Sequence, residues 1–224
     1  RFSFGDRRQA HIPMLLHPGP RSALFLGVGS GLTAGAATLH GDVEVTAVEL
    51  VPEIVGFLDA FDPYNRMADI DRIVVADARR FVRADKQTYD VIVADLFHPA
   101  RDGAGALYTR EHFAAVRGHL NEGGLFCQWL PLYQLDAPVV ATIVRTFLDV
   151  FPDAGGWIGT YNPRTPILGL VGRVGEPPAD LPWSLGGVDP ATDGPAPPTS
   201  WLAGVVERRG EGMAEELVEL ALTR

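Results

Sequence analysis

The chain has 224 residues, of which 46% are hydrophobic and 21% are charged, and these values indicate one globular domain. Its net charge of −9 argues against a nucleic-acid backbone or an anionic membrane surface as the partner, and suits a cationic ligand as well as simple solubility. Cys127 is the single cysteine, which excludes an internal disulfide, and no run approaches the ~18 apolar residues that span a bilayer, so we expect a cytoplasmic location. Because residue 1 is Arg1 rather than methionine, we expect a fragment or a processed chain.

Short apolar runs alternate with helix-like segments along most of the chain. The predicted strands are 23–29, 44–50, 72–77, 90–97 and 123–130. The predicted helices follow Gly31, start at Pro52, and cover 109–120 and 136–151. Runs this continuous in branched apolar residues are typical of strands buried on both faces. The alternation therefore predicts a doubly wound, mostly parallel α/β sheet of the Rossmann type.

After these elements the pattern changes. Residues 155–161 and 166–172 predict a hairpin, which would add an antiparallel edge to the sheet. Proline and glycine then become frequent, which predicts a surface loop. The expected division is a ligand-binding domain over 1–175 with a lead-in segment over 1–20, a loop over 176–200, and a C-terminal helical segment over 201–224.

Glycines and acids stand at the ends of four predicted strands. They are Gly27, Gly29 and Gly31 after the first strand, Glu49 after the second, Asp77 after the third and Asp95 after the fourth. In an open parallel sheet, ligands bind beyond these carboxyl ends. Glu49 follows the glycine loop by about 20 residues, the distance expected for a carboxylate that binds ribose hydroxyls. For Asp77 a helix cap is the alternative, but the ordered set of acids favours one nucleoside site.

The spacing of the glycines bears on the ligand. Dinucleotide-binding folds use G-x-G-x-x-G, whose third glycine would fall on Leu32. Here the third glycine comes one residue earlier, at Gly31. This G-x-G-x-G spacing is more typical of proteins that bind an adenosyl sulfonium, a ligand with no pyrophosphate. We therefore expect a sulfonium nucleoside as the ligand.

Four segments carry a family resemblance: "HIPMLLHPGPRSALFLGVGSG", "TAVEL", "VVADARRF" and "YDVIVADLFHPARDGAGALYTREHFAAV". The last three are similar to V-E-I-D, to G-D-G-x-x-F, and to Y-D-V-I-x-x-D-x-x-D-P ending in L-[FY]-T. Over 11–172 the chain thus resembles the spermidine synthase family of polyamine aminopropyltransferases. It is most similar to the branch that some bacteria fuse to membrane-spanning segments. The resemblance implies a methyltransferase-type Rossmann fold, and we consider a homodimer and membrane-spanning segments in a longer parent chain.

The resemblance also implies an activity and residue roles. The family binds decarboxylated S-adenosylmethionine and transfers its aminopropyl group to an amine, which releases methylthioadenosine. Asp95 matches the family's catalytic base and Glu49 its ribose contact. Asp77, with the adjacent Ala78, matches the adenine contact. Tyr108 matches the aromatic residue of L-[FY]-T, near the mouth of the site, with packing under that loop as the alternative.

Departures from the family motifs gather on the acceptor side of the expected site. Ser30 replaces an acid in the glycine loop, and His98 replaces the second acid of D-x-x-D-P. The family's Y-H-E motif would fall on 5–7 and is absent, and Asp102 stands where a proline flanks the adenine. A dication needs carboxylates, which a neutral imidazole cannot replace. His98 is either a base in its own right or a polar loop residue.

Other residues and readings complete the expectations. Gln128 ends the fifth predicted strand and could wall the site, whereas its neighbour Trp129 and the buried Cys127 are expected to pack in the core. The histidines show no metal-ligand spacing, so we expect no metal. Besides transfer to a small-molecule amine, two alternatives stay open. One is a methyltransferase that uses intact S-adenosylmethionine, and the other is a non-catalytic domain that senses a nucleoside.

Overall fold

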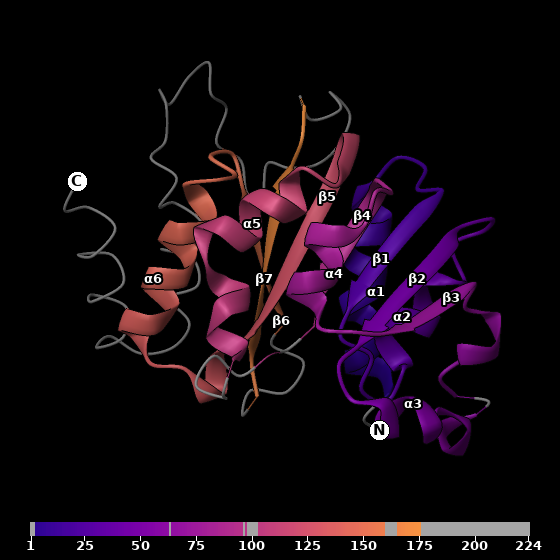
Figure 1. Ribbon diagram of the computed structural model, residues 1–224. Helices are drawn as coiled ribbons and strands as arrows, with labels where there is room; N and C mark the ends of the chain where they lie inside the picture. The colour runs from indigo at the N-terminus through magenta and orange to yellow at the C-terminus, as the bar shows by residue number, and fades with distance from the viewer. Residues whose placement is uncertain (1–2, 63, 96, 98–102, 160–164, 176–224) are drawn as a thin grey trace.

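The computed structural model describes residues 3–62, 64–95, 97, 103–159 and 165–175, which form one α/β unit (Figure 1). The strands are β1 (Ser22–Leu26), β2 (Glu44–Glu49), β3 (Arg72–Val75), β4 (Tyr89–Ala94), β5 (Leu120–Pro131), β6 (Gly155–Gly159) and β7 (Ile167–Arg173). They make one seven-stranded sheet within this part of the chain, in the order β3-β2-β1-β4-β5-β7-β6. The strands from β3 to β5 are parallel, and β7 is antiparallel to both β5 and β6. The predicted parallel sheet and its antiparallel hairpin are therefore confirmed.

Helices cover both faces of the sheet. They are α1 (Ser3–Leu16), α2 (Leu32–Ala37), α3 (Pro52–Gly56), α4 (Ala78–Ala84), α5 (Arg110–Arg117) and α6 (Ala137–Leu148), with 3-10 turns η1 (Leu58–Phe61), η2 (Met67–Asp69), η3 (Ala104–Tyr108) and η4 (Leu132–Gln134). Figure 1 shows α4, α5 and α6 in front of the sheet, with α1 and α2 behind it. Each side has its own apolar core, because alternate residues of a strand point to opposite faces. The front core includes a cluster of stacked rings, Phe126, Phe147 and Phe151.

Two parts of the chain differ from the sequence-based expectation. Helix α1 lies inside the segment 1–20, where only a lead-in was expected, and it contains Pro13. Packing explains it, because Ala10 and Met14 are buried in the rear core and the Trp129 indole donates to the carbonyl oxygen of Gln9 at 3.0 Å. The helix predicted over 109–120 ends at Arg117, because Leu120 already pairs with Tyr89 as the first residue of β5.

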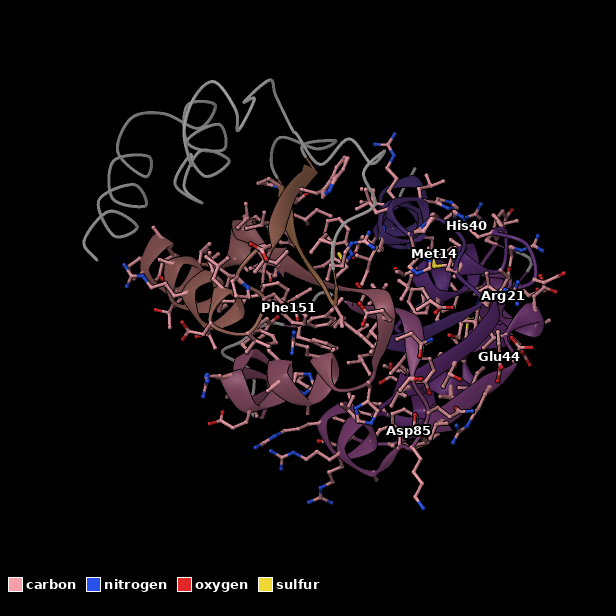
Figure 2. The ribbon with its side chains drawn as sticks, turned by 90° about the horizontal axis from the view of Figure 1, so that it is seen from above. Met14, Arg21, His40, Glu44, Asp85 and Phe151 are labelled. Atoms are coloured by element: carbon pink, nitrogen blue, oxygen red, sulfur yellow. The ribbon has the colours of Figure 1, made fainter. Side chains whose placement is uncertain are left out.

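Asp90 ties together the edge at which the parallel strands begin. Its carboxylate accepts hydrogen bonds from the backbone N–H groups of Arg21 and Ser22 and from the Asn121 side chain, at 2.7–3.0 Å. Burial alone would raise the pKa of Asp90, but these hydrogen bonds outweigh it and lower the pKa below its ordinary value. Figure 2 looks onto this edge, with Arg21 and Glu44 labelled along it. The glycine loop and the predicted acids lie at the opposite edge, where the parallel strands end.

The described helices are all too short or too polar to cross a membrane. The loop predicted over 176–200 and the helical segment predicted over 201–224 lie outside the described residues.

Candidate active site

The strand order places the candidate residues at the point where the sheet changes direction. Strand β1 has β2 on one side and β4 on the other, so the loops after β1 and β4 diverge to opposite faces. The glycine loop follows β1, Glu49 ends β2, and Asp95 follows β4 directly. Asp77 follows β3, the next strand outward. The acids predicted to share one edge of the sheet do share it.

The glycine loop has three residues with a left-handed backbone, at φ values of 91° for Gly27, 54° for Gly29 and 82° for Gly31. Such φ values favour glycine, which explains the alternation. A Cβ on Gly31 would also lie 2.5 Å from Met67 Cγ, so this glycine lets η2 pack closely against the loop. A Cβ on Gly29 would meet no atom within 4 Å. Gly29 therefore faces open space, as a residue that a ligand approaches must.

Glu49 holds this loop in place. Its Oε2 accepts hydrogen bonds from the N–H groups of Val28 at 3.1 Å and Gly29 at 3.2 Å, and its Oε1 accepts one from Val51 at 3.0 Å. The side chain is 7% exposed. A carboxylate has about four acceptor positions, so about one of them is left for another donor. The arrangement is compatible with the predicted ribose contact, and it adds a structural role that the sequence did not reveal.

Asp77 caps helix α4. Its Oδ1 accepts a hydrogen bond from the N–H of Arg80 at 2.9 Å, and Ala78 is the first residue of the helix. This is the alternative that the sequence left open. It does not exclude an adenine contact, because the side chain is exposed and its second carboxylate oxygen makes no hydrogen bond to the described residues. The adenine role of Asp77 and Ala78 stays a prediction.

Two residues that the sequence did not single out support the loop from behind. The Asn65 amide, 1% exposed, donates to the carbonyl oxygens of Ser30 at 3.2 Å and Leu58 at 2.8 Å. Helix α2 can approach this segment because Gly35 has no side chain, since a Cβ there would lie 1.6 Å from the Asn65 carbonyl oxygen. The signal in the sequence was a fourth glycine, four residues after Gly31. It maintains the close packing that the third glycine provides in dinucleotide folds.

On the other side of the loop, Asp95 and Phe97 follow β4. The N–H of Asp95 continues the ladder to the carbonyl oxygen of Leu26 at 3.1 Å, which fixes the backbone beside the end of β1. A Cβ on Gly27 would lie 3.6 Å from Asp95 Cβ and 3.0 Å from the ring of Phe97. Asp95 and the Phe97 ring therefore both lie against the first glycine of the loop.

The remaining residues predicted to contact the substrate differ in how far they are buried. Tyr108 is 6% exposed and its hydroxyl donates to the Phe97 carbonyl oxygen, which is compatible with the packing alternative, and its place near the mouth of the site stays a prediction. Gln128 is fully buried in β5, where its amide nitrogen donates to the Trp129 carbonyl oxygen and its amide oxygen has no partner in the described part of the chain. Ser30 is half-buried in the glycine loop. His98 and Asp102 lie outside the described residues.

Asp6 in α1 is a further acid, within the segment 5–7 where the family's Y-H-E motif is absent. The Thr33 hydroxyl, two residues beyond Gly31, donates to the backbone carbonyl oxygen of Asp6 at 3.3 Å. The half-buried carboxylate makes no hydrogen bond or ion pair within the described part of the chain. Burial raises the pKa of Asp6 above its ordinary value. A carboxylate in this state suits a cation supplied by a ligand. The described residues contain no group of three or more side chains suited to hold a metal ion.

The fold and the site together define a class, the Rossmann-like α/β proteins that include spermidine synthases and S-adenosylmethionine-dependent methyltransferases. The chain matches the spermine/spermidine synthase domain over residues 6–162 and belongs to that family. Solved methyltransferases share the fold at 16% identity, which bears on the fold alone.

Individual relatives agree with this assignment. Polyamine aminopropyltransferase 2 of Hyperthermus butylicus is 34% identical over 167 residues, which cover 72% of this chain and 55% of the relative. The solved spermidine synthase of Thermotoga maritima has a TM-score of 0.68 at 25% identity and covers 79% of this chain and 62% of that one. A spermidine synthase in complex with the transition state analogue AdoDATO has a TM-score of 0.64 at 25% identity, over 79% and 61% of the two chains. The chain thus spans about half the length of the curated relatives that it matches.

Proposed function

We propose that this chain binds decarboxylated S-adenosylmethionine over residues 1–175 and transfers its aminopropyl group to a small-molecule amine. The observation that carries the proposal is the glycine loop, fixed by Glu49 on one side and flanked by Asp95 on the other. Family membership and the names of its relatives, which include a spermidine synthase bound to a transition state analogue, support the same activity. The names of the relatives support the proposal without establishing it, since the chain covers about half the length of those relatives.

The chemistry assigns a separate task to each side of the loop. The lone pair of the acceptor nitrogen attacks the propyl carbon next to the sulfonium, a C–N bond forms, and the C–S bond electrons return to sulfur as neutral methylthioadenosine. The acceptor must first be neutral, although a free primary amine has a pKa of about 10. Asp95, beside Gly27, is the base that takes this proton. Holding both reactants in line supplies the rest of the acceleration.

Asp6 is our candidate for the ammonium group of the aminopropyl chain. It offers a half-buried carboxylate without a partner among the described residues, next to the start of α2. Asp6→Asn should therefore weaken binding of decarboxylated S-adenosylmethionine by about tenfold, the scale of one hydrogen bond to a charged group. Binding of methylthioadenosine, which has no aminopropyl chain, should stay within twofold. Calorimetry with both ligands separates the two effects, and an equal loss for both would contradict the assignment.

The proposal is tested by identifying the product. The purified chain is incubated with either sulfonium donor and a panel of primary amines, and the nucleoside product is separated by chromatography. Aminopropyl transfer yields methylthioadenosine, and the rival methyl transfer yields S-adenosylhomocysteine. Asp95→Asn should reduce aminopropyl transfer by about 10²–10⁴-fold, the usual contribution of a general base. The control Asp42→Asn changes an exposed acid in the turn before β2 and should leave the rate unchanged.

Two results would count against aminopropyl transfer. Formation of S-adenosylhomocysteine alone would identify a methyltransferase. Binding of methylthioadenosine without any product would identify a nucleoside-sensing domain. The proposed homodimer is a separate question, which sedimentation velocity at two concentrations answers.

A further inference from the structure

The ring of Phe97 is an apolar group beside the proposed base, Asp95. Two of its atoms, Cε1 and Cζ, lie 3.0 Å from the position that a Cβ on Gly27 would occupy. Asp95 Cβ lies 3.6 Å from the same position. The proposed base, the first glycine of the loop and an aromatic ring therefore meet in one small region.

A hydrogen bond and apolar packing hold Phe97 in this position. The buried Tyr108 hydroxyl donates to the Phe97 carbonyl oxygen, which fixes the backbone of the residue. Burial raises the pKa of Tyr108 above its ordinary value, so this hydroxyl stays protonated and remains a donor at any physiological pH. The Phe97 side chain also packs against the front core. Its ring is thus a fixed wall beside Asp95.

We propose that Phe97 determines acceptor specificity, and that the acceptor is a primary amine whose carbon substituent is apolar. The inference rests on the proposed function. Asp95 addresses the attacking nitrogen, and the ring offers apolar surface to the carbons attached to it. A wall of this kind disfavours a charged nitrogen near it, which helps to keep the acceptor amine neutral before attack. A second ammonium on the same acceptor would lose water beside the ring and gain at most a weak cation–π contact.

The experiment compares acceptors that differ only in the second ammonium. The full chain is supplied with decarboxylated S-adenosylmethionine and with 1-aminobutane or 1,4-diaminobutane, and kcat/KM is measured as methylthioadenosine formed. The pair 1-aminohexane and 1,6-diaminohexane repeats the comparison at a greater length. The wild type should prefer each monoamine by about tenfold or more, the discrimination that a hydrophobic pocket gives for small apolar groups.

Variants then assign this preference to the ring. Phe97→Ser should lower kcat/KM for the monoamines by about tenfold and abolish the preference, and Phe97→Leu should keep most of it because it keeps an apolar wall. Phe57→Ser is the matched control, since Phe57 is 68% exposed and follows the last residue of α3. Thermal unfolding of each variant shows whether it is folded. If Phe97→Ser does not fold, the comparison of the wild type with Phe97→Leu and the two acceptor pairs still decides.

Three outcomes would overturn the inference. Equal or better use of the diamines by the wild type refutes the acceptor class while leaving aminopropyl transfer standing. A loss of methylthioadenosine affinity in Phe97→Ser, matching the loss in kcat/KM, would place the ring at the sulfonium nucleoside instead of the acceptor. If no amine yields methylthioadenosine, the proposed function fails, and the acceptor assignment fails with it.

Discussion

His112 provides a stability prediction that can be worked out from the structure. It lies in α5, is 1% exposed, and neither ring nitrogen has a hydrogen-bond partner among the described residues. Burial lowers the pKa of His112 from 6.5 to about 4, with smaller lowering effects from Arg79 and Arg83 and an opposing one from Asp77. The folded protein therefore keeps this imidazole neutral at pH values at which the unfolded chain protonates it.

The sign and size of the effect follow from this difference. Between pH 6.5 and about 4 the unfolded chain binds more protons at this site, so stability falls as the pH falls through that window. With these two pKa values, His112 makes the protein about 2 kcal/mol less stable at pH 5 than at pH 7.5. In His112→Phe this loss disappears. Since the variant also removes two unsatisfied nitrogens, its stability at pH 7.5 should equal or exceed that of the wild type by about 1 kcal/mol.

Urea unfolding of the wild type and His112→Phe at pH 7.5 and pH 5 measures the effect as a difference of differences. Other groups that titrate in this range, such as His11, contribute equally to both proteins and cancel. The control is His119→Phe, because the ring nitrogens of His119 lie 2.9 Å from the Ala115 carbonyl oxygen and 3.0 Å from that of Asp85. This variant should lose about 1 kcal/mol. The reasoning fails if the wild type and His112→Phe lose the same stability on acidification.

Three further predictions concern the loop and the opposite edge. Gly35→Ala should lower the free energy of unfolding by more than about 3 kcal/mol, because its Cβ would overlap the Asn65 carbonyl oxygen. Gly29→Ala should cost about 1 kcal/mol, because its Cβ meets no atom and only the left-handed backbone is unfavourable for alanine. Denaturant unfolding of the pair checks the difference. Glu49→Gln should weaken methylthioadenosine binding by about 1.5–3 kcal/mol in calorimetry, and unchanged affinity would remove Glu49 from the site. Asp90→Asn should cost about 1.5–3 kcal/mol at pH 7. That difference should shrink below pH 4, since the stabilisation from a lowered carboxyl pKa is complete above the unfolded pKa and is lost as the pH falls through the folded one.

The sequence predicted those features that depend on local pattern. Apolar runs predicted the strands and their order along the chain predicted a parallel sheet, so the common edge of Glu49, Asp77 and Asp95 follows from the sequence alone. The family could also be predicted from spaced motifs, which are local as well. The functional roles of these acids remain predictions.

What the sequence could not predict depends on contacts between distant residues. The Asn65 amide donates to the carbonyl oxygen of Ser30, which lies 35 residues earlier in the chain. No local pattern around either residue predicts this hydrogen bond. Helix α1 has no distinct apolar stripe that would predict it from its own sequence. Its packing depends on distant residues such as Trp129, whose indole donates a hydrogen bond to the carbonyl oxygen of Gln9. The Phe97 ring is similar, since its importance lies in the closeness of Gly27 and not in any motif.

The residues that hold the glycine loop differ from those that would select the donor and the acceptor. The fold and the motifs therefore do not determine which reaction the chain catalyses. The Glu49 carboxylate accepts hydrogen bonds from the backbone N–H groups of Val28 and Gly29. The glycine loop would therefore have the same shape for any adenosyl sulfonium, with or without a carboxyl group. Selection between donors and among acceptors must then come from groups that reach past the nucleoside. We propose Asp6 on α1, and Asp95 with Phe97 after β4, as such groups. Their side chains can change without disturbing the loop, because Glu49 and Asn65 hold it independently. A family built this way can keep its nucleoside site and change its acceptor, and the residues after β4 are where such a change would be found.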